Sequence, residues 1–350
     1  MNPTAASPSP PPPRLLRLLR AFGRHEAAVL GLLVVLAAGI GLLNPAFFSW
    51  ANACNLLKSS VTLGLLALGV LVVLISGHID ISFPAIAACS MYVTCLAARA
   101  LPGLDHLWLL FPLAAAIGAT LGLLNAWLIH RFQLPALIVT LGTAGLIRGG
   151  MLAFIGTRIL TDLPASLIAF AKAQIFERPA PGGGTVGLSL SFFVLVAAAA
   201  GVWLFLNRTV AGRGVYAMGG APEAARRAGF NLGWLHALIH GLVGLLAGIA
   251  GLIHAAHMRN ANPFDIVGIE LTVIAAVVLG GASITGGRGS VAGTLLGVAL
   301  LVILNHSLLL VGLASEWQKV FLGLVILLST GFTARGARRR LPWTAPVYTP

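Results

Sequence analysis

The sequence predicts an all-α polytopic membrane protein with about ten transmembrane helices. Apolar residues make up 58% of the 350 positions, charged residues make up 9%, and the mean hydropathy is +0.96. Soluble domains are about 45–50% apolar and about 25% charged, so a soluble fold is excluded. Because one spanning helix takes about 20 residues, the roughly 203 apolar positions (58% of 350) can supply about ten spans.

The chain divides into three parts. Residues 1–24 form a proline-rich and basic segment without apolar periodicity, which we expect to be disordered. Residues 25–334 form the membrane domain, and residues 335–350 form a basic tail. The basic start and the apolar run 27–43 are also typical of a signal peptide, but further apolar runs follow and favour an uncleaved first span.

The apolar runs and the charges between them predict the topology. We place spans at about 27–43, 56–76, 83–100, 107–129, 134–155, 188–206, 234–256, 270–285, 291–313 and 317–334. With the N-terminus inside, the inner segments hold fourteen of the 22 basic residues, the outer ends hold seven, and Arg148 is left within a span. Positive charge favours the cytoplasm, so both termini are expected there, provided that the number of spans is even.

Several functional classes are excluded by composition and spacing. The net charge of +13 is explained by arginines that flank apolar helices, which removes the need for a nucleic-acid partner. Cys54, Cys89 and Cys95 have no CxxC spacing and are expected to be small core residues, not a disulfide framework or a metal site. No Ser-His or HExxH arrangement indicates an enzyme, so no catalytic residue is assigned.

Four histidines lie on one predicted span but are expected not to bind a common metal ion. His236 and His240 are four positions apart, as on one helix face, and His254 and His257 lie at the far end. The pairs are 18 positions apart (254 − 236), about 27 Å along a helix, so they lie near opposite membrane faces.

Two loops are long enough to carry a function. The outer loop 156–187 contains several prolines and Gly182–Gly184, and we expect it to be irregular. In the inner loop 207–233, Gly219–Gly220 suggests a turn, Pro222 suits the first position of a helix, and Gly229 suits its end. This pattern predicts a short helix at 221–229 that docks on a partner. The alternative is a solvated basic loop that only obeys the positive-inside rule.

Polar residues in or between spans are candidates for a solute path, because polar groups in hydrocarbon are costly. Asp80 sits between two apolar runs, either as a gate element or as a cap of the next helix through Ser82. The uncharged candidates for the path are Asn125, Thr140, Thr143, Ser283, Thr285 and Asn305. Hydroxyl and amide groups suit a sugar, and interhelical hydrogen bonding is the alternative for each of them.

Glycine pairs four positions apart predict close helix packing. Gly118 and Gly122, Gly244 and Gly248, and Gly293 and Gly297 follow the small-xxx-small pattern, which lets two helix backbones approach.

Four motifs, in order along the chain, resemble the ribose-type permeases of bacterial ABC importers. The motifs are ISGHIDIS at 75–82, similar to that family's SGGIDLS; VTLGT at 139–143 with Arg148-Gly149; AMGGAPEAAR at 217–226, similar to its coupling loop; and LGG at 279–281 with GGRGSVAGT at 286–294. The resemblance covers about 60–330. The chain departs from the pattern at His78, where glycine is usual, and at Phe83–Pro84.

The resemblance implies a multi-pass permease subunit of the bacterial inner membrane. It implies a second permease chain, identical or related, two cytoplasmic ATPase subunits, and a periplasmic binding protein that delivers a monosaccharide. The coupling residues would be Gly219, Gly220, Pro222, Glu223, Ala224, Ala225 and Arg226, and the path or gate residues would be Asp80, Ser82, Asn125, Thr140, Ser283 and Asn305.

ATP is expected on another chain. The sequence holds no GxxxxGK[ST] motif, and none of its three lysines, Lys58, Lys172 and Lys319, has the context of a phosphate loop. ATP and magnesium are therefore assigned to the partner ATPase, and no cofactor to this chain.

Three alternatives remain open from the sequence. The same architecture can import an amino acid or a nucleoside. An ion-coupled secondary transporter would place ionisable residues near the membrane midplane, where Arg148 is the candidate. An ATP-independent channel is also compatible with these patterns.

Overall fold

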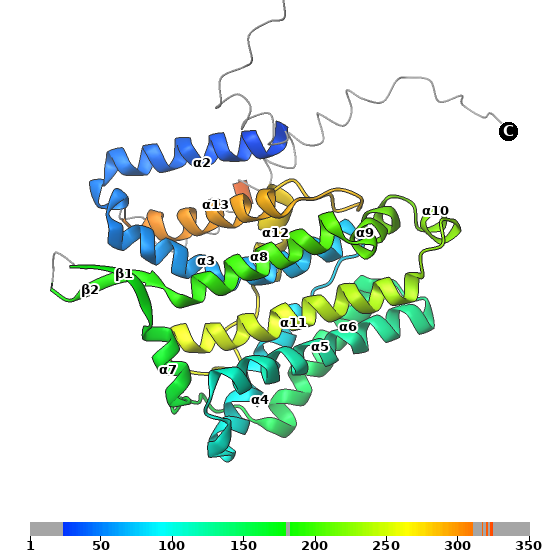
Figure 1. Cartoon of the computed structure of the whole chain (residues 1–350), viewed down its shortest axis with the longest axis horizontal. Coiled ribbons are helices and arrows are strands. Elements are labelled where there is room, and N and C mark those ends of the chain that lie inside the picture. The colour runs from blue at the N-terminus through cyan, green and yellow to red at the C-terminus, as the bar shows by residue number, and fades with distance from the viewer. Residues whose placement is uncertain (1–23, 180–182, 311–316, 318–319, 321–322, 325–350) are drawn as a thin grey trace, which may run out of the picture.

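The computed structural model describes residues 24–179 and 183–310, with Trp317, Val320, Gly323 and Leu324 beyond them. Long helices run side by side in a bundle (Figure 1). The long helices are α2 (Arg24–Leu43), α3 (Trp50–Ile75), α4 (Phe83–Ala100), α5 (Leu107–Phe132), α6 (Ala136–Gly150), α8 (Leu190–Arg208), α11 (Leu232–Met258) and α13 (Val291–Leu310). Shorter elements are α7 (Ala165–Lys172), α9 (Val210–Gly220), α10 (Pro222–Arg227), α12 (Glu270–Leu279) and the turns η1 (Pro45–Phe48), η2 (Pro102–Leu104) and η3 (Met151–Ile155).

Most of the expected spans correspond to helices. Among the described residues, seven helices are long and apolar enough to cross a membrane, and two shorter apolar helices cover 270–279 and 291–306. The span expected at 270–285 is too long, because the helix ends at Leu279 and a glycine-rich turn follows. The span expected at 317–334 and the tail 335–350 lie almost wholly outside the described residues, as does the segment 1–23.

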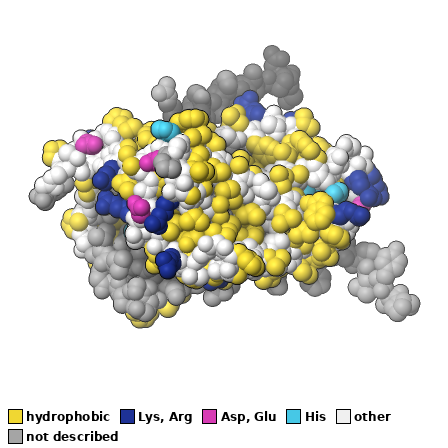
Figure 2. Space-filling model, turned by 90° about the horizontal axis from the view of Figure 1, so that it is seen from below, with side chains coloured by type: hydrophobic (Ala, Val, Ile, Leu, Met, Phe, Trp, Pro, Cys, Tyr) yellow, Lys and Arg dark blue, Asp and Glu magenta, His cyan; other side chains and the backbone are white. Residues whose placement is uncertain are grey.

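Three helices form the core of the bundle. In α3 and α4, 72% of the positions in the most apolar window are buried, and in α11 61% are, whereas α2, α5 and α6 bury 17–22%. The outer helices instead turn leucines, isoleucines and tryptophans outward, among them Trp127, Leu141 and Leu146. Figure 2 shows one face of this surface, with hydrophobic side chains across the middle and lysines and arginines gathered toward the two ends. This distribution is what a bilayer requires.

The antiparallel helices α5 and α11 touch through their backbones, and we call this contact the glycine seam. A methyl group on Gly118 would overlap the carbonyl oxygen of Gly244, and one on Gly122 would overlap that of His240. A methyl group on Gly248 would meet the carbonyl oxygen of Ala114. The glycine pairs that predicted close packing are confirmed, and the seam lies between the core and the outer helices.

The outer loop 156–187 is not irregular, so that expectation was wrong. It contains α7 and a hairpin of β1 (Gln174–Pro179) and β2 (Thr185–Ser189), which pair antiparallel. Gly183 and Gly184 adopt positive φ values of 87° and 83°, a conformation that glycine reaches without strain, and they lead the chain into β2. The hairpin lies at the end of the bundle opposite α9 and α10 (Figure 1).

The glycine seam predicts a large effect from a small substitution. Gly118→Ala should lower the free energy of unfolding by about 1–3 kcal/mol, because the new methyl group meets backbone atoms that cannot turn aside. Gly201→Ala on α8 is the matched control, since nothing lies within 4 Å of the position that its methyl group would take. Thermal unfolding of the purified protein in micelles measures both. Equal effects of the two substitutions would contradict the seam.

Candidate functional site

The segment 76–82 connects two buried helices, and its first backbone N–H groups are paired with the end of the preceding helix. At the end of α3, Gly77 has a φ of 80°, and its N–H donates to Leu74 O while that of His78 donates to Val73 O. This pattern is a Schellman motif, the usual way in which a glycine ends a helix. The chain then turns and begins α4 at Phe83, with Pro84 in the first helical turn. The local sequence therefore sets both boundaries.

A buried polar network, which we call the Asp80 network, holds this segment. Asp80 is 2% exposed, and its Oδ1 accepts hydrogen bonds from the backbone N–H and the hydroxyl of Ser82, both at 2.7 Å. Its Oδ2 lies 3.1 Å from Nδ1 of His240 on α11, which we assign as the protonated ring nitrogen because a carboxylate can only accept. Asn125 on α5 donates to the Ser82 hydroxyl at 2.8 Å. The network thus joins α4, α5 and α11.

The other candidate path residues divide into two groups. Thr140 on α6 is fully buried beside the network, where its Oγ1 accepts from the backbone N–H of Ile81 at 3.4 Å, and Thr143 is buried one turn further along α6. Ser283 lies outside the network, in the turn between α12 and α13, where its hydroxyl bonds that of Thr285 at 2.8 Å. Asn305 lies on α13. The structure therefore brings Asp80, Ser82, Asn125 and Thr140 together and leaves Ser283 and Asn305 apart.

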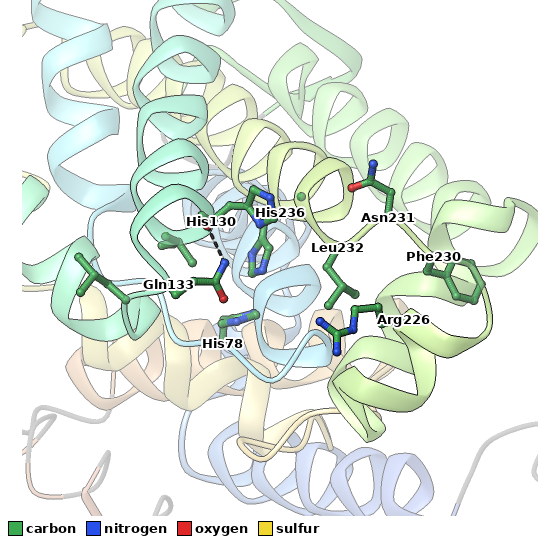
Figure 3. A pocket seen from close by; sticks show the side chains of 11 residues that line it. His78, His130, Gln133, Arg226, Phe230, Asn231, Leu232 and His236 are labelled. Atoms are coloured by element: carbon green, nitrogen blue, oxygen red, sulfur yellow. Dashed lines mark hydrogen bonds between the residues drawn. The ribbon is translucent and has the colours of Figure 1, made fainter.

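Three further histidines lie close to the Asp80 network, on the side that the predicted topology places toward the cytoplasm. The ring of His78 lies 4.8 Å from that of His236 and 6.4 Å from that of His240, and the ring of His130 lies 6.0 Å from that of His236. Three of these residues, His78, His130 and His236, line a cavity of about 410 Å³ together with Gln133 and Arg226 (Figure 3). We call this cavity the inner pocket. It lies beside α10, because Arg226 of that helix is one of the lining residues.

The short helix predicted at 221–229 is present as α10, and we call it the docking helix after its predicted role. Pro222 occupies its first turn, Glu223 bonds Arg226 at 2.8 Å, and Gly229 ends it with a φ of 90°. Pro222, Glu223 and Ala224 are exposed, while Ala225 is buried and anchors the helix. The expectation of a turn at Gly219–Gly220 was wrong, because both residues belong to the last turn of α9.

Glycines bring three segments into backbone contact behind the docking helix, and we call this contact the inner junction. The N–H of Gly287 donates to Ile75 O, at the end of α3, at 2.8 Å. A methyl group on Gly219 would overlap the same Ile75 oxygen, and one on Gly286 would meet Gly219 and Gly77 at under 3 Å. Larger side chains would separate α9 from the segment 76–82. The inner junction thus packs α9, the helix that precedes α10, against the segment that carries Asp80.

The sequence analysis missed His240, which is the partner of Asp80. The two residues are 160 positions apart, so no local pattern connects them. A usable signal was present, because an ionisable residue inside an apolar span needs a partner there. His78 was noted only as a departure from a motif, yet its ring lies 4.8 Å from that of His236 and 6.4 Å from that of His240.

Comparisons with known proteins identify the class. The family model described as "Branched-chain amino acid transport system / permease component" matches residues 52–330. The ribose import permease protein of Escherichia coli (strain K12) is 31% identical over 312 residues, which cover 89% of this chain and 94% of that protein. The ribose import permease protein of Bacillus subtilis (strain 168) is 36% identical, with 85% and 89% covered.

Another relative has a different printed substrate. The autoinducer 2 import system permease protein of Enterobacter sp. (strain 638) is 36% identical, with 86% of this chain and 82% of that protein covered. No solved structure matches the chain. The family match over 279 residues (52 to 330) and these relatives agree with the helical bundle and its exposed apolar surface. This chain therefore belongs to the permease component family of branched-chain amino acid transport systems, and it is a membrane-spanning transport subunit, not an enzyme.

Proposed function

We propose that this chain forms the path of an ATP-driven importer for a monosaccharide or a similar neutral, hydroxylated solute. The protruding docking helix α10 carries the proposal, because a transport subunit driven by another chain needs a surface on which that chain can act. Relatives named as ribose and autoinducer 2 import permeases support a small polar solute. An amino acid or a nucleoside is the alternative within the same architecture.

The proposal includes partners and an orientation. A second permease chain, identical or related, encloses the path, a periplasmic binding protein delivers the solute, and two ATPase subunits bind ATP and magnesium on the cytoplasmic side. Ten spans with both termini inside place α10 in the cytoplasm and the β1–β2 hairpin outside. The arginines near α10, including Arg213, Arg226 and Arg227, support this orientation.

Thiol labelling tests the orientation. Glu177→Cys on β1 should react with a membrane-impermeant maleimide in intact cells, and Glu223→Cys on α10 should react only after permeabilisation. The wild-type protein is the control, since its three cysteines are 1–8% exposed. Labelling of position 223 in intact cells, with none at position 177, would show that the orientation is the reverse of the proposed one.

The docking helix should couple ATP hydrolysis to transport. Glu223→Arg with Ala224→Trp changes charge and size on its exposed face, and we expect transport to fall by about tenfold, a loss of about 1.4 kcal/mol of coupling. The membrane fold should survive, because these side chains lie outside the core. Uptake and ATPase activity in vesicles are the measurements. Arg208→Glu with Val210→Trp, also exposed but outside α10, is the matched control. Wild-type uptake in the α10 variant would refute the assignment.

The segment 76–82 is the proposed gate, and the Asp80 network sets its shape. The inner junction connects it to α9 and α10, so a displacement of the docking helix reaches this segment first. The carboxylate supports this role by its bonds to Ser82 and His240, which tie the segment to α4 and α11. We propose that Asp80, Ser82, Asn125 and Thr140 hold and release this gate. Ser283 lies in the turn between α12 and α13 and Asn305 lies on α13, so they remain candidates for the path outside the gate.

Substitutions at Asp80 separate its charge from its shape. Asp80→Asn can still accept from Ser82, so we expect normal assembly and reduced uptake. Asp80→Leu strands the Ser82 and His240 donors in the core, and the free energy of unfolding should fall by about 3–5 kcal/mol. Adding His240→Leu should recover part of this loss, because removing both partners leaves fewer unsatisfied groups.

The matched control for these substitutions is Asp105→Asn. Asp105 also accepts two backbone N–H bonds at a helix start, from Ala165 and Ser166 of α7, but it lies at the outer surface. Those bonds, chiefly from Ser166, lower the pKa of its carboxyl group. Uptake should be unchanged in this variant. For the Asp80–His240 pair, the double variant Asp80→Leu with His240→Leu is compared with the two single variants. If its loss in free energy of unfolding equals the sum of the two single losses, the proposed pairing is contradicted.

A further inference from the structure

The inner pocket joins the two parts of the molecule that the proposed function requires to move. His78 comes from the segment 76–82, Arg226 and Phe230 come from α10 and the turn after it, and Gln133 comes from the turn between α5 and α6. Figure 3 shows His130 and His236 on one side of the cavity, His78 on the other, and Arg226 directed inward from α10. All of these segments therefore contribute to the lining of one cavity.

The hydrogen-bonding groups of the inner pocket include both acceptors and donors. The Ser76 hydroxyl donates to Val73 O, so it accepts from Nδ1–H of His78, and His78 Nε2 keeps its lone pair. The Gln133 amide donates to His130 O, which leaves Oε1 as an acceptor. Asn231 accepts from the N–H of Trp234 through Oδ1, which leaves its NH₂ group as a donor.

The charge of the inner pocket is balanced. The guanidinium of Arg226 bonds the carboxylate of Glu223 at 2.8 Å and keeps further N–H groups for a ligand. Burial, and secondly the neighbouring His240, lowers the pKa of His78 to about 4, so this ring is neutral at physiological pH. A phosphate or carboxylate group needs donors on every side and is repelled by acceptor lone pairs. Hydroxyl groups both donate and accept, and they match this mixed set.

We propose that the inner pocket is a cytoplasmic binding site for the imported neutral, hydroxylated solute and that its occupation slows the transport cycle. The inference rests on the proposed function. The volume of about 410 Å³ lies within the range of small-molecule sites, and Phe230 and Leu232 add apolar contacts. A ligand that bonds His78, Gln133 and Arg226 together stabilises the arrangement seen here over any arrangement in which α10 has moved. Solute that accumulates inside therefore reduces its own import.

The test uses proteoliposomes that contain the full transporter, with ATP inside and labelled D-ribose supplied outside with the binding protein. Loading about 10 mM unlabelled D-ribose inside, roughly ten times a millimolar Kd, should slow initial uptake by up to about tenfold. Gln133→Leu removes the amide oxygen that can accept a hydrogen bond in the pocket. Gln133→Asn keeps the amide but shortens the side chain, and asparagine tolerates the φ of 52° at this position. Internal ribose should slow uptake by both variants less than about twofold.

Asn207→Leu is the matched control, because this residue also donates to a carbonyl oxygen of its own helix near the inner end but does not line the pocket. Internal ribose should slow uptake by this variant as much as it slows uptake by the wild type. Uptake that is unaffected by internal ribose, or slowed equally in the Gln133 variants, would overturn the proposal. Inhibition by internal phosphate or ribose 5-phosphate, but not by ribose, would identify an anion site and overturn it as well.

A second measurement separates this inference from the proposed function. Equilibrium dialysis of labelled ribose against the permease–ATPase complex, without the binding protein, reports on the pocket alone. If ribose binds saturably and Gln133→Leu abolishes the binding, the pocket proposal is upheld. If the same protein shows no uptake, only the proposed transport of ribose fails. Absence of binding overturns the pocket.

Discussion

The buried carboxylate of Asp80 is the constraint on which the inner half of the molecule depends. A charge in the core must be matched by donors, and the Ser82 N–H, the Ser82 hydroxyl and His240 supply them. Because these donors come from two helices, the carboxylate fixes the start of α4 relative to α11. The interrupted chain at 76–82 can therefore persist among buried helices, with its own backbone groups paired at the end of α3.

The inner junction gives this arrangement its connection to the surface. Glycines allow α9, the end of α3 and the turn before α13 to meet through backbone atoms, and the Tyr216 hydroxyl of α9 adds a bond to Gly289 O of that turn at 2.9 Å. The proposed route from the exposed face of α10 to the buried network therefore runs through α9 and this junction. Gly77, Gly219 and Gly286 each lie in one of the motifs that resemble the ribose-type permeases, at 75–82, 217–226 and 286–294.

Local signals in the sequence predicted the helices well and long-range pairings poorly. Pro222 and Gly229 determine α10 by their own backbone preferences, and the apolar runs located most spans within a few residues. The bond from Asp80 to Ser82 was anticipated because the two residues are neighbours. His240 was not, since a contact across 160 positions depends on how α3, α4 and α11 pack. The β1–β2 hairpin was missed because its proline and glycine content suggested an irregular loop.

The glycine seam between α5 and α11 also limits how the subunit can deform. Side chains between two helices can change rotamer when one helix shifts, so they allow small relative movements. The seam has no such layer of side chains at Gly118, Gly122, Gly244 and Gly248. We therefore expect the two antiparallel helices to move as one rigid body. Because α5 and α11 run from the end of the bundle beside α10 to the end beside α7 (Figure 1), a shift of one helix at either end has to carry the other helix with it.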